Sequence, residues 1–66
     1  MMLIGKVLEY DDRSGIIIDE NANKYLLLNQ DIYDEDIKTG DYVKFDKEVF
    51  KKTYEDSLIA RYVKKI

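Results

Sequence analysis

The chain has 66 residues, enough for one small domain and close to the lower limit for a core that is stable without disulfides or a bound metal. It contains no Cys and no His, so disulfides, conventional zinc sites and histidine acid–base catalysis are excluded. Its net charge of −3 argues against a wide phosphate-binding surface.

No apolar run approaches the length of a membrane span, and no basic region followed by a long apolar stretch opens the chain. We therefore expect one domain over residues 1–66, in the cytoplasm, with no contact to a membrane. The charge is uneven along this domain. Residues 1–36 hold three basic against nine acidic residues, net −6, whereas residues 37–66 hold eight against five, net +3.

The first half of the chain reads as three strands joined by two polar turns. In the turn at 11–15, Gly15 can adopt a positive φ, and in the turn at 21–23 either Asn tolerates the left-handed region. Alternating or continuous apolar residues predict strands over Leu3–Tyr10, Ile16–Asp19 and Lys24–Asn29.

The second half reads as an acidic connection followed by two longer strands. Residues 30–39 are irregular, with room for a short helical turn, and Ile32 and Ile37 are the expected anchors into the core. A polar loop at 51–56 separates strands predicted over Tyr42–Phe50 and Ser57–Val63. In the first of these, Val43, Phe45 and Val49 are expected to point inward. Five short strands at this spacing predict an all-β chain that closes into a small barrel.

The basic half offers one stretch in which lysines alternate with aromatic rings. This pattern is typical of a surface that contacts a phosphate backbone. It is equally typical of a solvated strand and hairpin tip whose lysines prevent edge-to-edge pairing. The residues concerned are Lys44, Lys47, Lys51 and Lys52, with Phe45, Phe50 and Tyr54.

Two aliphatic runs, at 16–18 and 26–28, place bulky apolar side chains on both faces of neighbouring strands. Their outer members would expose roughly a few hundred Å² of apolar surface, near the limit for a monomer. Either a second copy or a protein partner covers this face, or the long strand-four hairpin folds over it with Phe50 and Tyr54. The outer members are Ile16, Ile18, Leu26 and Leu28.

Three segments resemble the cold-shock protein family of five-stranded antiparallel OB-fold barrels. The opening Met2–Val7 is similar to the family's first strand, and Ile37–Phe45 is similar to its glycine-led start of strand four. Lys24–Ile32 aligns without gaps to the second nucleic-acid motif. The resemblance implies a cold-shock-like OB-fold and binding of single-stranded DNA or RNA on strands one to three.

The chain departs from that family where its aromatic rings would stack on bases. Glu9 stands in place of a Trp, the first motif becomes Gly15–Ile18, and the second has aliphatic side chains in place of Phe and His. Tyr10 is the one aligned stacking ring that persists, and stacking on one ring contributes about 1–3 kcal/mol per base. The alignment also leaves Asp19 where the family buries an Ile, which a two-residue shortening of the preceding loop relieves.

No pattern in the chain indicates catalysis. Ser14 and Ser57 have no partner base, the three glycines form no phosphate loop, and no cofactor motif occurs. The acidic clusters at 11–12 and 34–36 lack the spacing of a calcium loop, so we expect no metal site.

The expected function is therefore that of a non-enzymatic binding module. The resemblance favours weak, salt-dependent binding of single-stranded nucleic acid through Tyr10, Arg13, Lys24, Tyr25 and Lys44. The alternative is a protein-interaction or homodimerisation module that uses the four outer aliphatic side chains. An accessory domain of a larger assembly is a third hypothesis.

Overall fold

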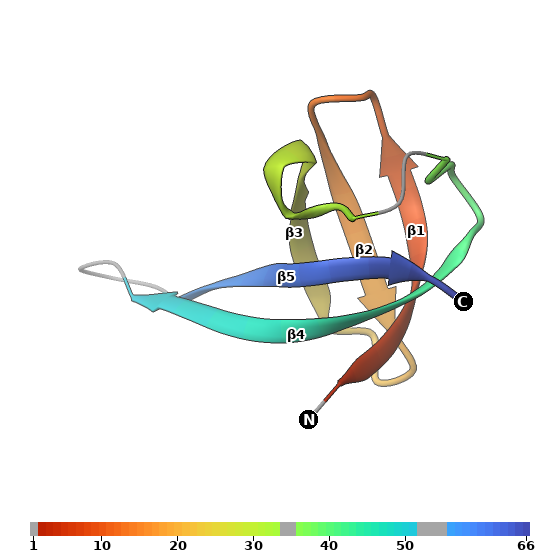
Figure 1. Cartoon of the computed structure of the whole chain (residues 1–66). Helices are drawn as coiled ribbons and strands as arrows, with labels where there is room; N and C mark the ends of the chain where they lie inside the picture. The colour runs from red at the N-terminus through yellow and green to blue at the C-terminus, as the bar shows by residue number, and fades with distance from the viewer. Residues whose placement is uncertain (1, 34–35, 52–55) are drawn as a thin grey trace.

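The computed structural model describes residues 2–33, 36–51 and 56–66, and these form a closed barrel of five β-strands (Figure 1). A short 3-10 turn, η1 (Asn29–Asp31), follows the third strand. The structure confirms the predicted all-β class and five-stranded barrel. The strands are β1 (Leu3–Tyr10), β2 (Ser14–Asp19), β3 (Lys24–Leu28), β4 (Tyr42–Lys51) and β5 (Asp56–Lys65).

Around the barrel the strands follow the order β1-β2-β3-β5-β4, and every neighbouring pair is antiparallel except β3 with β5. One parallel pair is unavoidable, because directions cannot alternate around a closed ring with an odd number of strands. This parallel seam is short: within it Leu26 pairs with Ile59, and an isolated bridge joins Ile32 to Val63 just beyond.

The core is built from side chains of all five strands. Tyr25 joins it from β3, and Ile37 closes one end from the β3–β4 connection, with Ile32 packed against the same cluster. Both isoleucines thus act as the anchors that the sequence predicts. The largest fully buried side chains are Phe45, Ile17, Leu27, Val7, Val43 and Val63.

The two polar turns form where predicted, but different residues take the left-handed conformation. Asp12 (φ 71°) and Ala22 (φ 65°) have positive φ, whereas Gly15 lies buried inside β2. The Asp11 carboxylate closes the first turn by accepting 3.0 Å hydrogen bonds from the backbone N–H groups of Arg13 and Ser14. Gly15 is needed for a different reason, because a Cβ there would overlap the Glu9 carbonyl oxygen.

Beyond the barrel, β4 and β5 continue as a two-stranded arm (Figure 1). β1 begins at Leu3, opposite Phe45, so the later residues of β4 have no β1 partner among the described residues. Val49, which we expected to point inward, is therefore exposed, as is Phe50. Phe50 does not seal the aliphatic face, since Leu26 remains 41% exposed, and Tyr54 lies outside the described residues.

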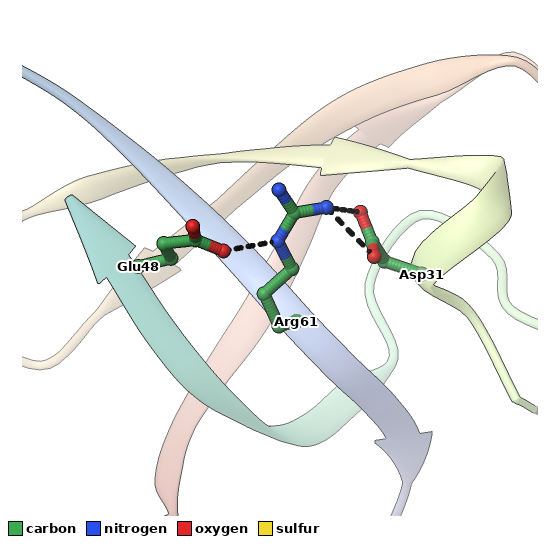
Figure 2. Close-up of polar contacts among 3 residues, drawn as sticks. All are labelled: Asp31, Glu48 and Arg61. Atoms are coloured by element: carbon green, nitrogen blue, oxygen red, sulfur yellow. Dashed lines mark hydrogen bonds and ion pairs between the residues drawn. The ribbon is translucent and has the colours of Figure 1, made fainter. Parts of the chain in front are cut away.

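Arg61 of β5 ties the base of this arm to the 3-10 turn (Figure 2). Its Nε donates a 2.6 Å hydrogen bond to the Glu48 carboxylate of β4, and its Nη1 donates to both carboxylate oxygens of Asp31 at 2.9–3.0 Å. The carboxylates of Glu48 and Asp31 raise the pKa of Arg61. Because Asp31 follows β3, this ion pair also crosses the parallel seam.

A β-bulge interrupts β5 just after Arg61. Tyr62 and Val63 together lie opposite the single residue Phe45, since the register shifts between the pairs at Lys44 and Asp46. Tyr62 adopts φ 54°, the left-handed region in which a side chain with a Cβ costs about 1–2 kcal/mol. The bulge turns the Tyr62 ring outward and lets Val63 point into the core, where it is fully buried.

Candidate nucleic-acid interface

One row of outward side chains crosses four neighbouring strands. Lys24 of β3 pairs with Ile18 of β2, Ile18 with Lys6 of β1, and Lys6 with Tyr42 of β4. At about 4.8 Å between strands, the row spans roughly 14 Å. Two cations, an aliphatic side chain and an aromatic ring therefore lie in line on the outside of the barrel.

A hollow of about 670 Å³ opens along this row, between the start of β1, the end of β2 and the start of β4. Ile4 and Ile18 line it with apolar surface, and the Lys6 ammonium lies 5.9 Å from the centre of the Tyr42 ring. Tyr42 is 58% exposed, so its ring is accessible. A flat ring of a ligand can stack there while an anionic group attached to it reaches Lys6.

Lys44 of β4 extends the cationic surface that Lys24 and Lys6 form on the row. It lies on the outward face of β4, two residues after Tyr42, and pairs with Ile4 on one side and Lys64 of β5 on the other. Among the described residues, no carboxylate lies within ion-pairing distance of Lys6, Lys44 or Lys64. By contrast, Arg61 binds the carboxylates of Asp31 and Glu48, and Lys65 binds that of Asp41. Three lysine charges on this side are thus available to an anion.

Asp19 and Glu20 also line the hollow and oppose this positive charge. The Asp19 carboxylate accepts 2.9 Å hydrogen bonds from the backbone N–H groups of Asn21 and Asn23 and a 2.6 Å bond from the Tyr25 hydroxyl. These bonds, the Tyr25 bond foremost, hold the pKa of Asp19 below its usual range. The family alignment places Asp19 at a buried position, but its carboxylate is hydrogen-bonded at the barrel end and stays ionised.

Tyr25, predicted as a nucleic-acid contact, is instead a core residue. Its side chain is 3% exposed and packs edge-on against Phe45, with ring centres 4.9 Å apart. Burial and the bond to Asp19 raise the pKa of Tyr25 to about 12. The prediction was wrong because the strand register points this residue, together with Leu27, into the barrel.

The remaining predicted contacts do not form one site. Tyr10 is half-buried against the core, and its hydroxyl accepts a 3.0 Å hydrogen bond from the Asn29 side chain, which limits the ring as a stacking surface. Arg13 is exposed in the β1–β2 turn. Lys24 lies at the far end of the β2–β3 ladder from that turn. Only Lys24 and Lys44 belong to the cationic surface described above.

The four outer aliphatic side chains are arranged along the β2–β3 ladder rather than in a compact block. Ile16 pairs directly with Leu26, while Ile18 and Leu28 lie at its two ends, opposite Lys24 and Ser14. Leu26 is 41% exposed and the other three are half-buried. The apolar patch is therefore centred on the Ile16–Leu26 pair.

Neither Lys6 nor Tyr42 was among the contacts predicted from the sequence. Both lie within predicted strands, and only the β1–β4 register brings the two side chains together. The signal that was available is the alternation of Ile4, Lys6 and Leu8 on one face of the first strand.

No protein-family model matches the chain, and no curated protein matches it. In the part of the chain that the structure describes, no helix is long and apolar enough to cross a membrane. Within the same residues, no three acidic side chains come together in a way that could hold a metal ion.

Proposed function

We propose that this protein is a non-enzymatic module that binds single-stranded nucleic acid weakly, through the outward row of β1–β4 and the neighbouring lysines. The observation that carries this proposal is the hollow lined by Tyr42 and Lys6, in which the Lys6 ammonium lies over the exposed Tyr42 ring. An exposed ring beside a cation fits a base and its phosphate, because stacking tolerates any base and the ammonium contacts the backbone.

A single strand suits the geometry better than a duplex. The row is narrow, and in it the aliphatic Ile18 and the ring of Tyr42 alternate with Lys24 and Lys6. The aliphatic side chain and the ring suit contact with unpaired bases rather than with the two phosphate backbones of a duplex. The affinity is expected to be low, because Asp19 and Glu20 line the same hollow and repel phosphate.

The test is an NMR titration of the chain with a short pyrimidine strand at low salt. Backbone amides of β1, β2 and the start of β4 should shift, and a duplex of the same length should shift them less. Lys6→Gln should weaken binding and reduce the slope of log affinity against log salt by about 0.7, the value for one phosphate contact to a single strand. Lys51→Gln, the same charge change on the arm, is the matched control.

If the strand shifts no amide of these elements, the proposal fails. It also fails if Lys6→Gln and Lys51→Gln weaken binding equally, since the effect would then follow net charge rather than this site.

The alternative function, self-association or capture of a protein through the aliphatic patch, is favoured by the exposure of Leu26 beside Ile16. Sedimentation of the wild-type chain and of Leu26→Asp tests it. A dimer that becomes a folded monomer in the variant supports this function, and a wild-type monomer at high concentration argues against it.

A further inference from the structure

A second aromatic site lies on β5, beyond the row described above. Tyr62 and Tyr33 are both more than half exposed, and their rings meet edge to face, with centres 5.8 Å apart and planes at 87°. The Lys64 ammonium lies 6.0 Å from the centre of the Tyr33 ring. Two accessible rings and a cation thus form an open corner on the surface.

The backbone holds both rings in place. The N–H of Tyr33 donates a 2.9 Å hydrogen bond to the Val63 carbonyl, and Ile32 forms a bridge with Val63 directly beside it. Tyr62 is fixed by the bulge of β5. A planar ligand therefore meets a corner that is already formed, which reduces the ordering cost of binding.

The residue type at position 62 is not explained by the fold. The left-handed backbone there favours Gly or Asn, and Tyr is strained in it, yet the ring gains little burial in return. A strained residue that presents an accessible ring is better explained by a surface role than by packing.

We propose that Tyr62 and Tyr33 form a base-stacking site, with Lys64 contacting the phosphate next to the stacked base. The inference rests on the proposed single-strand binding and deepens it. Lys64 pairs with Lys44, and Lys44 lies two residues from Tyr42 on the same face. The strand would thus continue from the hollow, across Lys44 and Lys64, to this corner.

Charge distinguishes a nucleic acid from other planar ligands. Lys64 already supplies a cation to the Tyr33 ring, so a second cation would be repelled, while the anionic backbone of a nucleic acid is attracted. A neutral base flanked by phosphates matches both the rings and the lysine.

The test compares Tyr62→Asn with the wild-type chain on two ligands, a pyrimidine strand and the same strand with all its bases removed. Asn tolerates the left-handed backbone, so the fold is expected to persist. Tyr62→Asn should lower affinity for the intact strand at least about fivefold, the effect of losing one stacked base, and leave affinity for the abasic strand unchanged. Lys64→Gln should weaken binding of both strands. Phe50→Ala, which removes an exposed ring on the arm, should weaken binding of neither.

Each remaining outcome overturns the inference. If Lys6→Gln weakens binding of the intact strand and Tyr62→Asn does not, the proposed function stands and this site is wrong. If Tyr62→Asn weakens intact and abasic strands equally, the ring does not stack on a base. If the wild-type chain sediments as a dimer and Tyr62→Asn as a monomer, the corner is a contact between copies. If no strand binds, both proposals fail.

Discussion

The Tyr25 hydroxyl donates a 2.6 Å hydrogen bond to the Asp19 carboxylate, which joins the barrel core to the β2–β3 turn. Asp19 also accepts the backbone N–H groups of Asn21 and Asn23. The phenol is thus the link between a buried ring and a carboxylate that organises the turn.

This link predicts a loss of stability at high pH. The pKa of Tyr25 is raised from 10.0 to about 12, so the folded state favours the protonated phenol. Its contribution is complete below about pH 10 and is lost as the pH rises through about 12. Tyr25→Phe should cost about 1.5–3 kcal/mol at neutral pH, the value of a hydrogen bond to a charged group, and should flatten the alkaline decline. Denaturant unfolding at several pH values measures both.

Tyr42→Phe is the matched control, because it removes a hydroxyl from an exposed ring on β4. Its unfolding free energy should stay within about 0.5 kcal/mol of the wild-type value. Equal destabilisation by Tyr25→Phe and Tyr42→Phe would contradict the role assigned to the Asp19 bond.

Two glycines are expected to respond differently to the same substitution. Gly15→Ala should prevent stable folding or cost several kcal/mol, because the new Cβ would overlap the Glu9 carbonyl oxygen of the neighbouring strand. Gly40→Ala meets nothing within 4 Å and bears only the strain of φ +94°, about 1 kcal/mol. Thermal unfolding of both variants decides this, and a milder effect at Gly15 than at Gly40 would refute it.

Neighbouring isoleucines of β2 provide a test of the register. Ile17 is fully buried, so Ile17→Ala should cost about 2–5 kcal/mol through the cavity that it leaves. Ile18 points outward between Lys6 and Lys24, so Ile18→Ala should cost clearly less and should weaken oligonucleotide binding. Urea unfolding of the two variants gives the comparison. A larger loss of stability for Ile18→Ala would show that Ile18, rather than Ile17, faces the core.

The two carboxylates that bind Arg61 are expected to contribute differently to the stability of the fold. The Asp31 side chain is 12% exposed and accepts two hydrogen bonds, whereas that of Glu48 is 52% exposed and accepts one. Asp31→Asn should therefore destabilise more than Glu48→Gln, whose effect should be below about 1 kcal/mol. Hydrogen exchange of β5 amides would report the difference, and equal exchange rates in the two variants would argue against it.

Much of the architecture could be predicted from alternation and turn residues. The five strands, the anchors at Ile32 and Ile37, and the outward positions of Ile16 and Ile18 follow from these patterns. The predicted strand limits differ by one or two residues. β2 begins earlier than predicted because Ser14 and Gly15 read as part of a turn, and β5 runs past Val63 because the lysines that follow are exposed.

The candidate site was harder to predict, because it depends on which residues face one another across strands. Lys24 and Tyr25 are adjacent in sequence, but the first is exposed and the second is buried in the core. A shift of one residue in register would exchange the two positions. The Lys6–Tyr42 pair depends on β1 meeting β4, which are separated by more than thirty residues of chain. The strain at Tyr62 arises from a bulge that no local pattern reveals.

The shortness of the parallel contact between β3 and β5 has a consequence for how the molecule forms and opens. The β1–β2–β3 meander needs only local turns, whereas joining β3 to β5 requires the rest of the chain to be in position, so this closure is expected to come last in folding. The same boundary should separate first in transient opening, which would leave the β4–β5 hairpin attached to the three-strand sheet only through the pairing of β4 with β1.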